Sequence, residues 1–176
     1  MGSVRAPEKA KFFAGIFSSD AAIFPDIQRR LEKSFGPADF ESAVLDFSHT
    51  DYYTDEFGDC LKRQFFSFRR PASLEGIHKA KLITNRLEAR FMKHGKRTIN
   101  IDPGYLTLSK VVLLTTKDYT HRLYLAKGIY AEVTLYFKDR TFNPWPWTYP
   151  DYRTGEYREL FNAIRHRFHK EVLGPC

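Results

Sequence analysis

Apolar and polar residues alternate along the chain in a pattern that predicts short strands and three helices. Short apolar runs predict buried strands at residues 11–17 and 110–116, and a further strand is predicted at residues 61–69. Residues 129–137 alternate β-branched or aromatic side chains with other residues, as a half-buried strand does. Weaker strand patterns occur at residues 41–47, 97–101 and 122–125. Apolar positions three or four residues apart predict helices at residues 21–35, 74–94 and 155–172.

The order of these elements indicates one α+β domain over residues 1–176. Residues 8–101 follow the order β-α-β-β-α-β, which is typical of a ferredoxin-like unit. Residues 102–176 would add a strand-rich extension and a terminal helix. Residues 143–150 contain three prolines, so we expect them to wrap the surface rather than form a central strand. The polar stretch 49–59 is expected to be a connection.

Composition narrows the class of protein. Hydrophobic residues make up 43% of the chain and aromatic residues 16%, enough for a well-packed core. Cys60 and Cys176 are the only cysteines, which excludes a disulfide framework or a cysteine zinc site and fits a reducing cytoplasm. No apolar stretch approaches the ~18 residues needed to cross a bilayer. We therefore expect a cytoplasmic protein with no membrane partner.

Charge is distributed unevenly along the chain. Residues 1–60 hold 11 acidic and 6 basic side chains, whereas residues 61–176 hold 10 acidic and 22 basic ones. This asymmetry favours an anionic partner, such as a nucleotide, a phosphorylated metabolite or RNA. The alternative is a basic surface of lysines and arginines that merely face solvent.

Residues 115–124 (TTKDYTHRLY) place many ionisable and hydrogen-bonding side chains directly behind a buried strand. Histidine titrates near neutral pH and can act as a general acid or base, whereas lysine and arginine can hold phosphate. The alternative is a hairpin turn with solvated charges at its tip. The candidate roles are acid or base for His121, an orienting carboxylate for Asp118, phosphate binding for Lys117 and Arg122, and pocket lining for Tyr119 and Tyr124.

Two further carboxylates are candidates to join this segment. Asp102 lies in NIDPGY (residues 100–105), which we expect to end the fourth strand and turn at Pro103-Gly104, with Tyr105 lining the pocket. Asp-Pro-Gly is equally typical of an ordinary turn. Glu132 interrupts the strand at residues 129–137 and is either exposed by normal alternation or a buried acid with a partner.

Known chemical motifs are absent from the sequence. It contains no phosphate-binding glycine loop, dinucleotide fingerprint, Ser-His-Asp order or metal-ligand spacing. The sequence therefore leaves open whether the protein is an enzyme, which cofactor it uses and its oligomeric state. The phenylalanine-rich residues 12–16 and 62–68 weakly resemble the base-stacking strands of RNA-recognition motifs, but core packing also explains them.

Several phrases resemble a known family over nearly the whole chain. These are FFAGIFSSD, LKRQFFSF, NIDPGYLTLSKVVLLTTKDYTHRLYL, GIYAEVTLYF and PWTYPDYRT. They resemble the domain-of-unknown-function family 4416. The resemblance implies a stand-alone single domain in bacteria or archaea and assigns no catalytic residue.

These observations lead to two hypotheses about function. In the first, the protein binds a phosphate-bearing ligand beside residues 115–124, with Asp102 and Asp118 orienting His121 and with phosphoester hydrolysis or transfer as the reaction to test. This hypothesis predicts that His121, Lys117, Arg122 and Asp102 converge in space. In the second, the protein is a non-catalytic RNA- or protein-binding module that uses an exposed sheet face.

Overall fold

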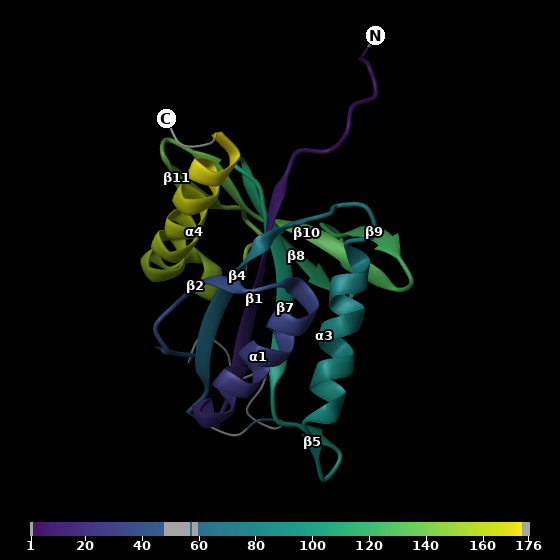
Figure 1. Ribbon diagram of the computed structural model, residues 1–176, viewed down its shortest axis with the longest axis vertical. Coiled ribbons are helices and arrows are strands. Elements are labelled where there is room, and N and C mark those ends of the chain that lie inside the picture. The colour runs from purple at the N-terminus through teal and green to yellow at the C-terminus, as the bar shows by residue number, and fades with distance from the viewer. Residues whose placement is uncertain (1, 48–56, 58–59, 174–176) are drawn as a thin grey trace.

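A large antiparallel sheet forms the centre of the protein in the computed structural model, which describes residues 2–47, 57 and 60–173 (Figure 1). Its strands run in the order β11-β10-β8-β7-β1-β4-β2, with β3 added on β4 and β9 on β10. The strands are β1 (Ala10–Ser18), β2 (Ala38–Glu41), β3 (Leu45–Asp46), β4 (Lys62–Ala72), β7 (Asn100–Leu106), β8 (Lys110–Thr115), β9 (Leu123–Ala126), β10 (Ile129–Lys138) and β11 (Thr141–Pro144).

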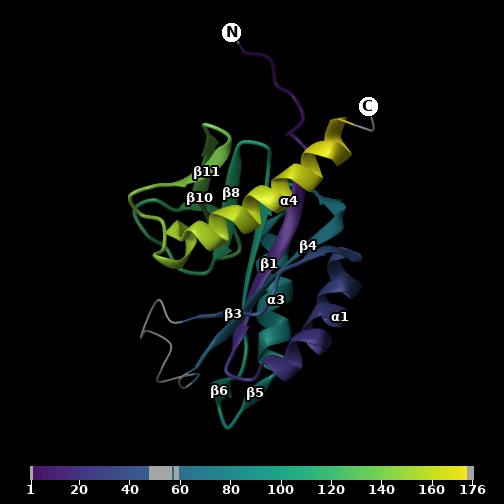
Figure 2. The same cartoon turned by 90° about the vertical axis from the view of Figure 1, so that its left-hand side faces the viewer.

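Helices cover both faces of this sheet, as the two perpendicular views show (Figures 1 and 2). Helices α1 (Phe24–Phe35) and α3 (His78–Arg90) pack on one face, and α4 (Gly155–Leu173) packs on the other. Short 3₁₀ turns, η1 (Ala21–Ile23) and η3 (Asp151–Arg153), precede α1 and α4. A small hairpin of β5 (Met92–Lys93) and β6 (Lys96–Arg97) follows α3. The prediction of a mixed α and β architecture is confirmed.

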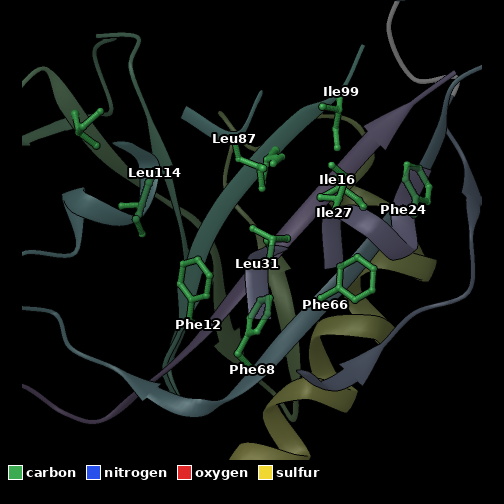
Figure 3. Close-up of a cluster of buried hydrophobic side chains, with 14 residues drawn as sticks. Phe12, Ile16, Phe24, Ile27, Leu31, Phe66, Phe68, Leu87, Ile99 and Leu114 are labelled. Carbon is green, nitrogen blue, oxygen red and sulfur yellow. The ribbon is translucent and has the colours of Figure 1, made fainter. Parts of the chain in front are cut away.

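The face beneath α1 and α3 is closed by an apolar cluster (Figure 3). Ile27 and Leu31 share one face of α1 because they are four residues apart, and both are buried. The chain enters this helix through Asp20, whose carboxylate accepts from the Ala22 N–H, and leaves it at Gly36 with a φ of 90°. Sheet and helix side chains labelled in the figure fill the space between them: Phe12, Ile16, Phe66, Phe68, Leu87, Ile99 and Leu114.

The opposite face is covered by α4. Phe161 of this helix packs edge-on against Phe13 of β1 and Phe65 of β4, with ring centroids 5.0 and 5.6 Å apart. Lys11 is fully buried at the far end of the same face, where its ammonium pairs with Asp39 and with Glu171 of α4. The phenylalanines that resemble base-stacking positions are therefore core residues, and α4 occupies the place that bases would take.

Two expected strands differ from the observed ones. Residues 41–47 were predicted as one strand, but β2 ends at Glu41 and β3 begins at Leu45. The partners on β4 are Phe66 for Glu41 and Arg63 for Leu45, so this edge carries one extra residue. At this irregularity the Ser42 hydroxyl oxygen accepts a hydrogen bond from the Phe65 N–H at 3.0 Å, in place of a backbone carbonyl.

The prediction that residues 100–105 end a strand and turn is wrong. Asn100–Leu106 is one continuous strand, β7, which pairs with β1 along its whole length. Gly104 is needed there for close approach, since a Cβ at this position would lie 2.5 Å from the ring of Phe13. Pro103 and Gly104 therefore lie inside a strand, where Gly104 allows close packing, and they do not form a turn.

A bulge in β10 also changes which side chains share a face. Simple alternation predicts that Val133 and Leu135 face the same way. The register shifts between them, however, and Leu135 joins the core beneath α4. The polar stretch at residues 49–59 falls almost wholly outside the described residues. Pro144 ends β11 at the edge of the sheet, as its missing N–H requires.

Candidate functional site

The sheet splits between its two neighbouring strands β7 and β8. These strands pair from Gly104–Leu113 to Leu106–Val111, and beyond Gly104 they separate. Helix α3 replaces the missing partner at Ile101: the Glu88 carboxylate accepts from the Ile101 N–H at 2.6 Å, and the Lys81 ammonium donates to the Ile101 C=O at 2.9 Å. The backbone N–H and C=O of Ile101 therefore keep their hydrogen bonds although β8 is absent there.

Pro103 lies where β8 separates from β7, next to the last paired residue, Gly104. Backbone groups in an antiparallel strand alternate between its two edges, so the Pro103 nitrogen lies on the same edge as that of Ile101. A proline has no N–H to satisfy on that edge. This explains why a proline is tolerated inside β7, at the place where its neighbour leaves.

A cleft of about 540 Å³ opens where the strands separate. One wall comes from α3, the β5–β6 hairpin and β7, and the other comes from the end of β8, the residues after it and β10. Residues around η3 and Phe47 close a third side. The charged lining contains four cations and four carboxylates: Arg63, Lys81, Arg97, Lys117, Glu88, Asp102, Glu132 and Asp151.

Arg63 is the most deeply buried cation of the cleft, with a side chain only 2% exposed. It starts from β4 and donates to Asp151 at 2.7 Å and to Asp102 at 3.0 Å, although Asp102 lies on β7 and β1 runs between them. Gly15 of β1 makes this reach possible, since a Cβ there would lie 3.2 Å from the guanidinium and 2.7 Å from the Phe65 ring. The missing side chain of Gly15 thus gives the guanidinium a passage across β1.

Aromatic rings surround this guanidinium. Its central carbon lies 4.9 to 5.8 Å from five ring centroids, those of Phe17, Phe47, Phe65, Tyr152 and Tyr157. Its Nε has no hydrogen-bond partner among the described residues. Ring faces attract a cation, so the box stabilises a buried positive charge that two carboxylates neutralise.

Burial and pairing set the protonation of these groups. Burial by itself would lower the pKa of Arg63, but the acidic side chains around it outweigh that effect and raise it, so the guanidinium stays charged. Burial raises the pKa of Asp151 against the opposing effect of Arg63. Burial likewise raises the pKa of Glu88, and Lys81 opposes the change. The cleft therefore contains two carboxyls with raised pKa values, and Arg63 beside them remains a cation.

Glu132 organises the other wall. Its carboxylate is 1% exposed and lies 2.7 Å from the Arg122 Nε and 3.1 Å from the His121 Nε2. Arg122 also donates to the Lys117 C=O at 3.0 Å and to the Tyr149 hydroxyl, which fixes the chain after β8. The His121 ring stacks on Trp147, with centroids 5.6 Å apart. Glu132 is thus a buried acid with two partners rather than a solvent-facing residue.

The predicted site residues fall into three groups. Asp102, Lys117 and Glu132 line the cleft, and His121 and Arg122 contact it through Glu132. Asp118, Tyr119 and Tyr124 are exposed outside the lining, with Tyr119 against His121 and Tyr124 against Tyr130. Tyr105 is half-buried on the face covered by α1 and α3, opposite Phe12, where burial raises its pKa.

Sequence reasoning missed the wall formed by α3 and the buried arginine. Lys81, Asn85 and Glu88 follow one another at helical spacing, so they share one side of α3, and this polar side faces the cleft. A charge beside the phenylalanines of KRQFFSF in a predicted strand could have indicated Arg63, because charges are seldom buried without partners. Asp151 gave no such signal, since it lies in a loop-like phrase.

The described residues contain neither a candidate metal cluster nor a helix suited to spanning a membrane. Among them, no group of three or more histidine, cysteine, aspartate or glutamate side chains is arranged to hold a metal ion. In the same part of the chain, no helix combines the length and apolar character needed to cross a membrane.

Comparison with known proteins gives one match. Residues 8–168 match the family model described as Domain of unknown function (DUF4416). A search of curated proteins finds no match. A search of solved structures also finds none.

Proposed function

The chain belongs to the DUF4416 family, and from the geometry of its cleft we propose that it binds a small phosphate-bearing ligand there. The observation that carries the proposal is the split between β7 and β8, which sets Lys81 on one wall and Lys117 on the other. Opposed cations in one concave site suit a phosphate group, which accepts hydrogen bonds on all sides.

The two lysines complement each other in exposure. Lys81 is buried and donates one hydrogen bond, to the Ile101 C=O, while Glu88 lies 3.9 Å away. An ammonium has three donors, so Lys81 keeps donors for a ligand. Lys117 is exposed at the rim, where a cation attracts an approaching anion.

If the protein catalyses a reaction, phosphoester hydrolysis or transfer is the one to test, with Asp102 as the acid–base group. Its side chain is 30% exposed, whereas the Asp151 side chain is 8% exposed and those of Glu88 and Glu132 less. Asp102 is also held at both oxygens, by Arg63 and by Asn100 at 2.8 Å. A fixed, accessible carboxylate is what proton transfer requires.

We also propose that residues 8–101, completed by the rest of β7, form a ferredoxin-like unit. The order β7-β1-β4-β2 with both crossing helices on one face supports this proposal. The competing module that binds RNA or protein through an open sheet face is less favoured, because α4 covers the face that would bear the aromatic contacts.

Thermal-shift and calorimetric screening tests the binding proposal. A phosphorylated compound at about 100 times its dissociation constant stabilises the fold by roughly 2.7 kcal/mol, and its dephosphorylated counterpart should not. Lys117→Met should weaken binding, whereas Lys138→Met, an exposed lysine outside the cleft, should leave it unchanged. Absence of binding by every phosphorylated compound at millimolar concentration would refute the proposal.

A further inference from the structure

The lining of the cleft is too varied for a phosphate alone. Beside the charged groups it presents apolar and aromatic surface from Phe47, Leu113, Leu114, Tyr149 and Pro150. A bare phosphate or a small sugar phosphate has no surface of this kind to bury. A ligand that fills the cleft therefore carries a flat or apolar part as well as an anion.

Hydrogen-bonding groups in the same cleft indicate what that flat part contains. Asn85 lines the cleft, and none of the described residues hydrogen-bonds to its side-chain amide. An amide offers a donor and an acceptor side by side, which matches the donor–acceptor edges of nucleobases. The carboxylate of Asp102 accepts one bond at each oxygen, and each oxygen has room for a second donor.

We propose that the ligand is a nucleoside phosphate. This inference rests on the proposed function, since it assigns the phosphate to Lys81 and Lys117. It adds that Asn85 and Asp102 recognise the N–H and acceptor groups of the nucleoside, over the apolar surface of the cleft. The volume of about 540 Å³ lies within the range of small-ligand sites and accommodates a mononucleotide.

Isothermal titration of the full chain with three kinds of probe tests the assignment. The probes are the four common ribonucleoside 5′-monophosphates, ribose 5-phosphate, and a short single-stranded oligoribonucleotide with a 5′-phosphate. At least one monophosphate should bind about tenfold more tightly than ribose 5-phosphate, which corresponds to about one or two hydrogen bonds together with stacking. Binding by the oligoribonucleotide alone would assign the same nucleoside phosphate chemistry to an RNA end.

Two variants distinguish the nucleoside assignment from the phosphate site on which it rests. Asn85→Ala should weaken the preferred monophosphate about tenfold and leave ribose 5-phosphate within about twofold. Arg86→Ala, an exposed neighbour on α3 outside the lining, is the matched control and should change neither affinity. Equal affinity for ribose 5-phosphate and every monophosphate would overturn the nucleoside assignment while the phosphate site stands. Binding of none of these probes would overturn the nucleoside assignment, whereas the phosphate site is refuted only if no phosphorylated compound binds.

Discussion

Replacing Arg63 by methionine should destabilise the protein strongly, because it removes the buried cation that pairs with Asp151 and Asp102. Methionine fills much of the aromatic box but carries no charge. Asp151 is then left buried without its 2.7 Å partner, and Asp102 loses its 3.0 Å contact. Removal of one member of a buried ion pair costs about 3–5 kcal/mol. For a chain of this length that loss lowers the melting temperature by about 6–20 °C.

The size of the loss should depend on pH, and the sign follows from the carboxyl that remains. Burial raises the pKa of Asp151, and the variant loses the largest opposing effect, which is the charge of Arg63. A carboxyl whose folded pKa lies above its unfolded value of about 3.9 favours folding when protonated, and this contribution is lost as the pH rises. The deficit of Arg63→Met relative to wild type should therefore be smaller at pH 4 than at pH 7.

Urea denaturation of four proteins measures this: wild type, Arg63→Met, Asp151→Asn and the double variant. The double variant no longer contains the uncompensated charge at residue 151, so it should recover part of the loss seen in Arg63→Met. A loss below about 1 kcal/mol at pH 7, unchanged at pH 4, would refute the view that Arg63 neutralises these carboxyls.

Three further predictions concern the other buried features. Gly15→Ala should lower the free energy of unfolding by about 1–3 kcal/mol, measured by urea denaturation, because its Cβ would lie 2.7 Å from the Phe65 ring. The control Gly155→Ala, with nothing within 4 Å of its Cβ, should leave that free energy unchanged. Equal effects of the two substitutions would refute the passage of Arg63 across β1. Lys11→Met should lower stability by about 3–5 kcal/mol, because it leaves the buried Asp39 carboxylate without its cation. Exposed Lys9→Met should cost less than about 0.5 kcal/mol, and similar values for the two variants would contradict the buried pairing of Lys11 with Asp39 and Glu171. Because burial raises the pKa of Glu88, the contribution of this carboxyl to the stability of the wild type falls as pH rises above about 4.3. Glu88→Gln should therefore compare more favourably with wild type at pH 7 than at pH 4, and the opposite trend in urea titrations would contradict it.

Local patterns in the sequence predicted most of the elements. The buried strand around Phe13, the helix stripe of Ile27 and Leu31 and the inward face of α4 follow from spacing alone, because each depends on neighbours in the chain. The error at residues 100–105 has a long-range cause. Asp-Pro-Gly favours a turn locally, and only the crowding by Phe13 and the departure of β8 keep it extended.

The candidate site was predicted in part, for a similar reason. Lys117 and Glu132 lie beside a recognisable strand end, so composition indicated that wall of the cleft. The contact between Arg63 and Asp102 depends on the register of three strands and on a glycine in the middle one. No spacing in the sequence reveals such a coincidence, because it arises only when the sheet is assembled.

The split sheet also has a mechanical consequence. Only three residue pairs, from Gly104–Leu113 to Leu106–Val111, join β7 to β8, so these pairs act as a hinge line between two halves of one sheet. Beyond them, Lys81 and Glu88 hold β7 from the side, and β8 is held by β10. A change in the width of the gap would therefore break no hydrogen bond of the β7–β8 ladder, because the two strands are not paired beyond Gly104.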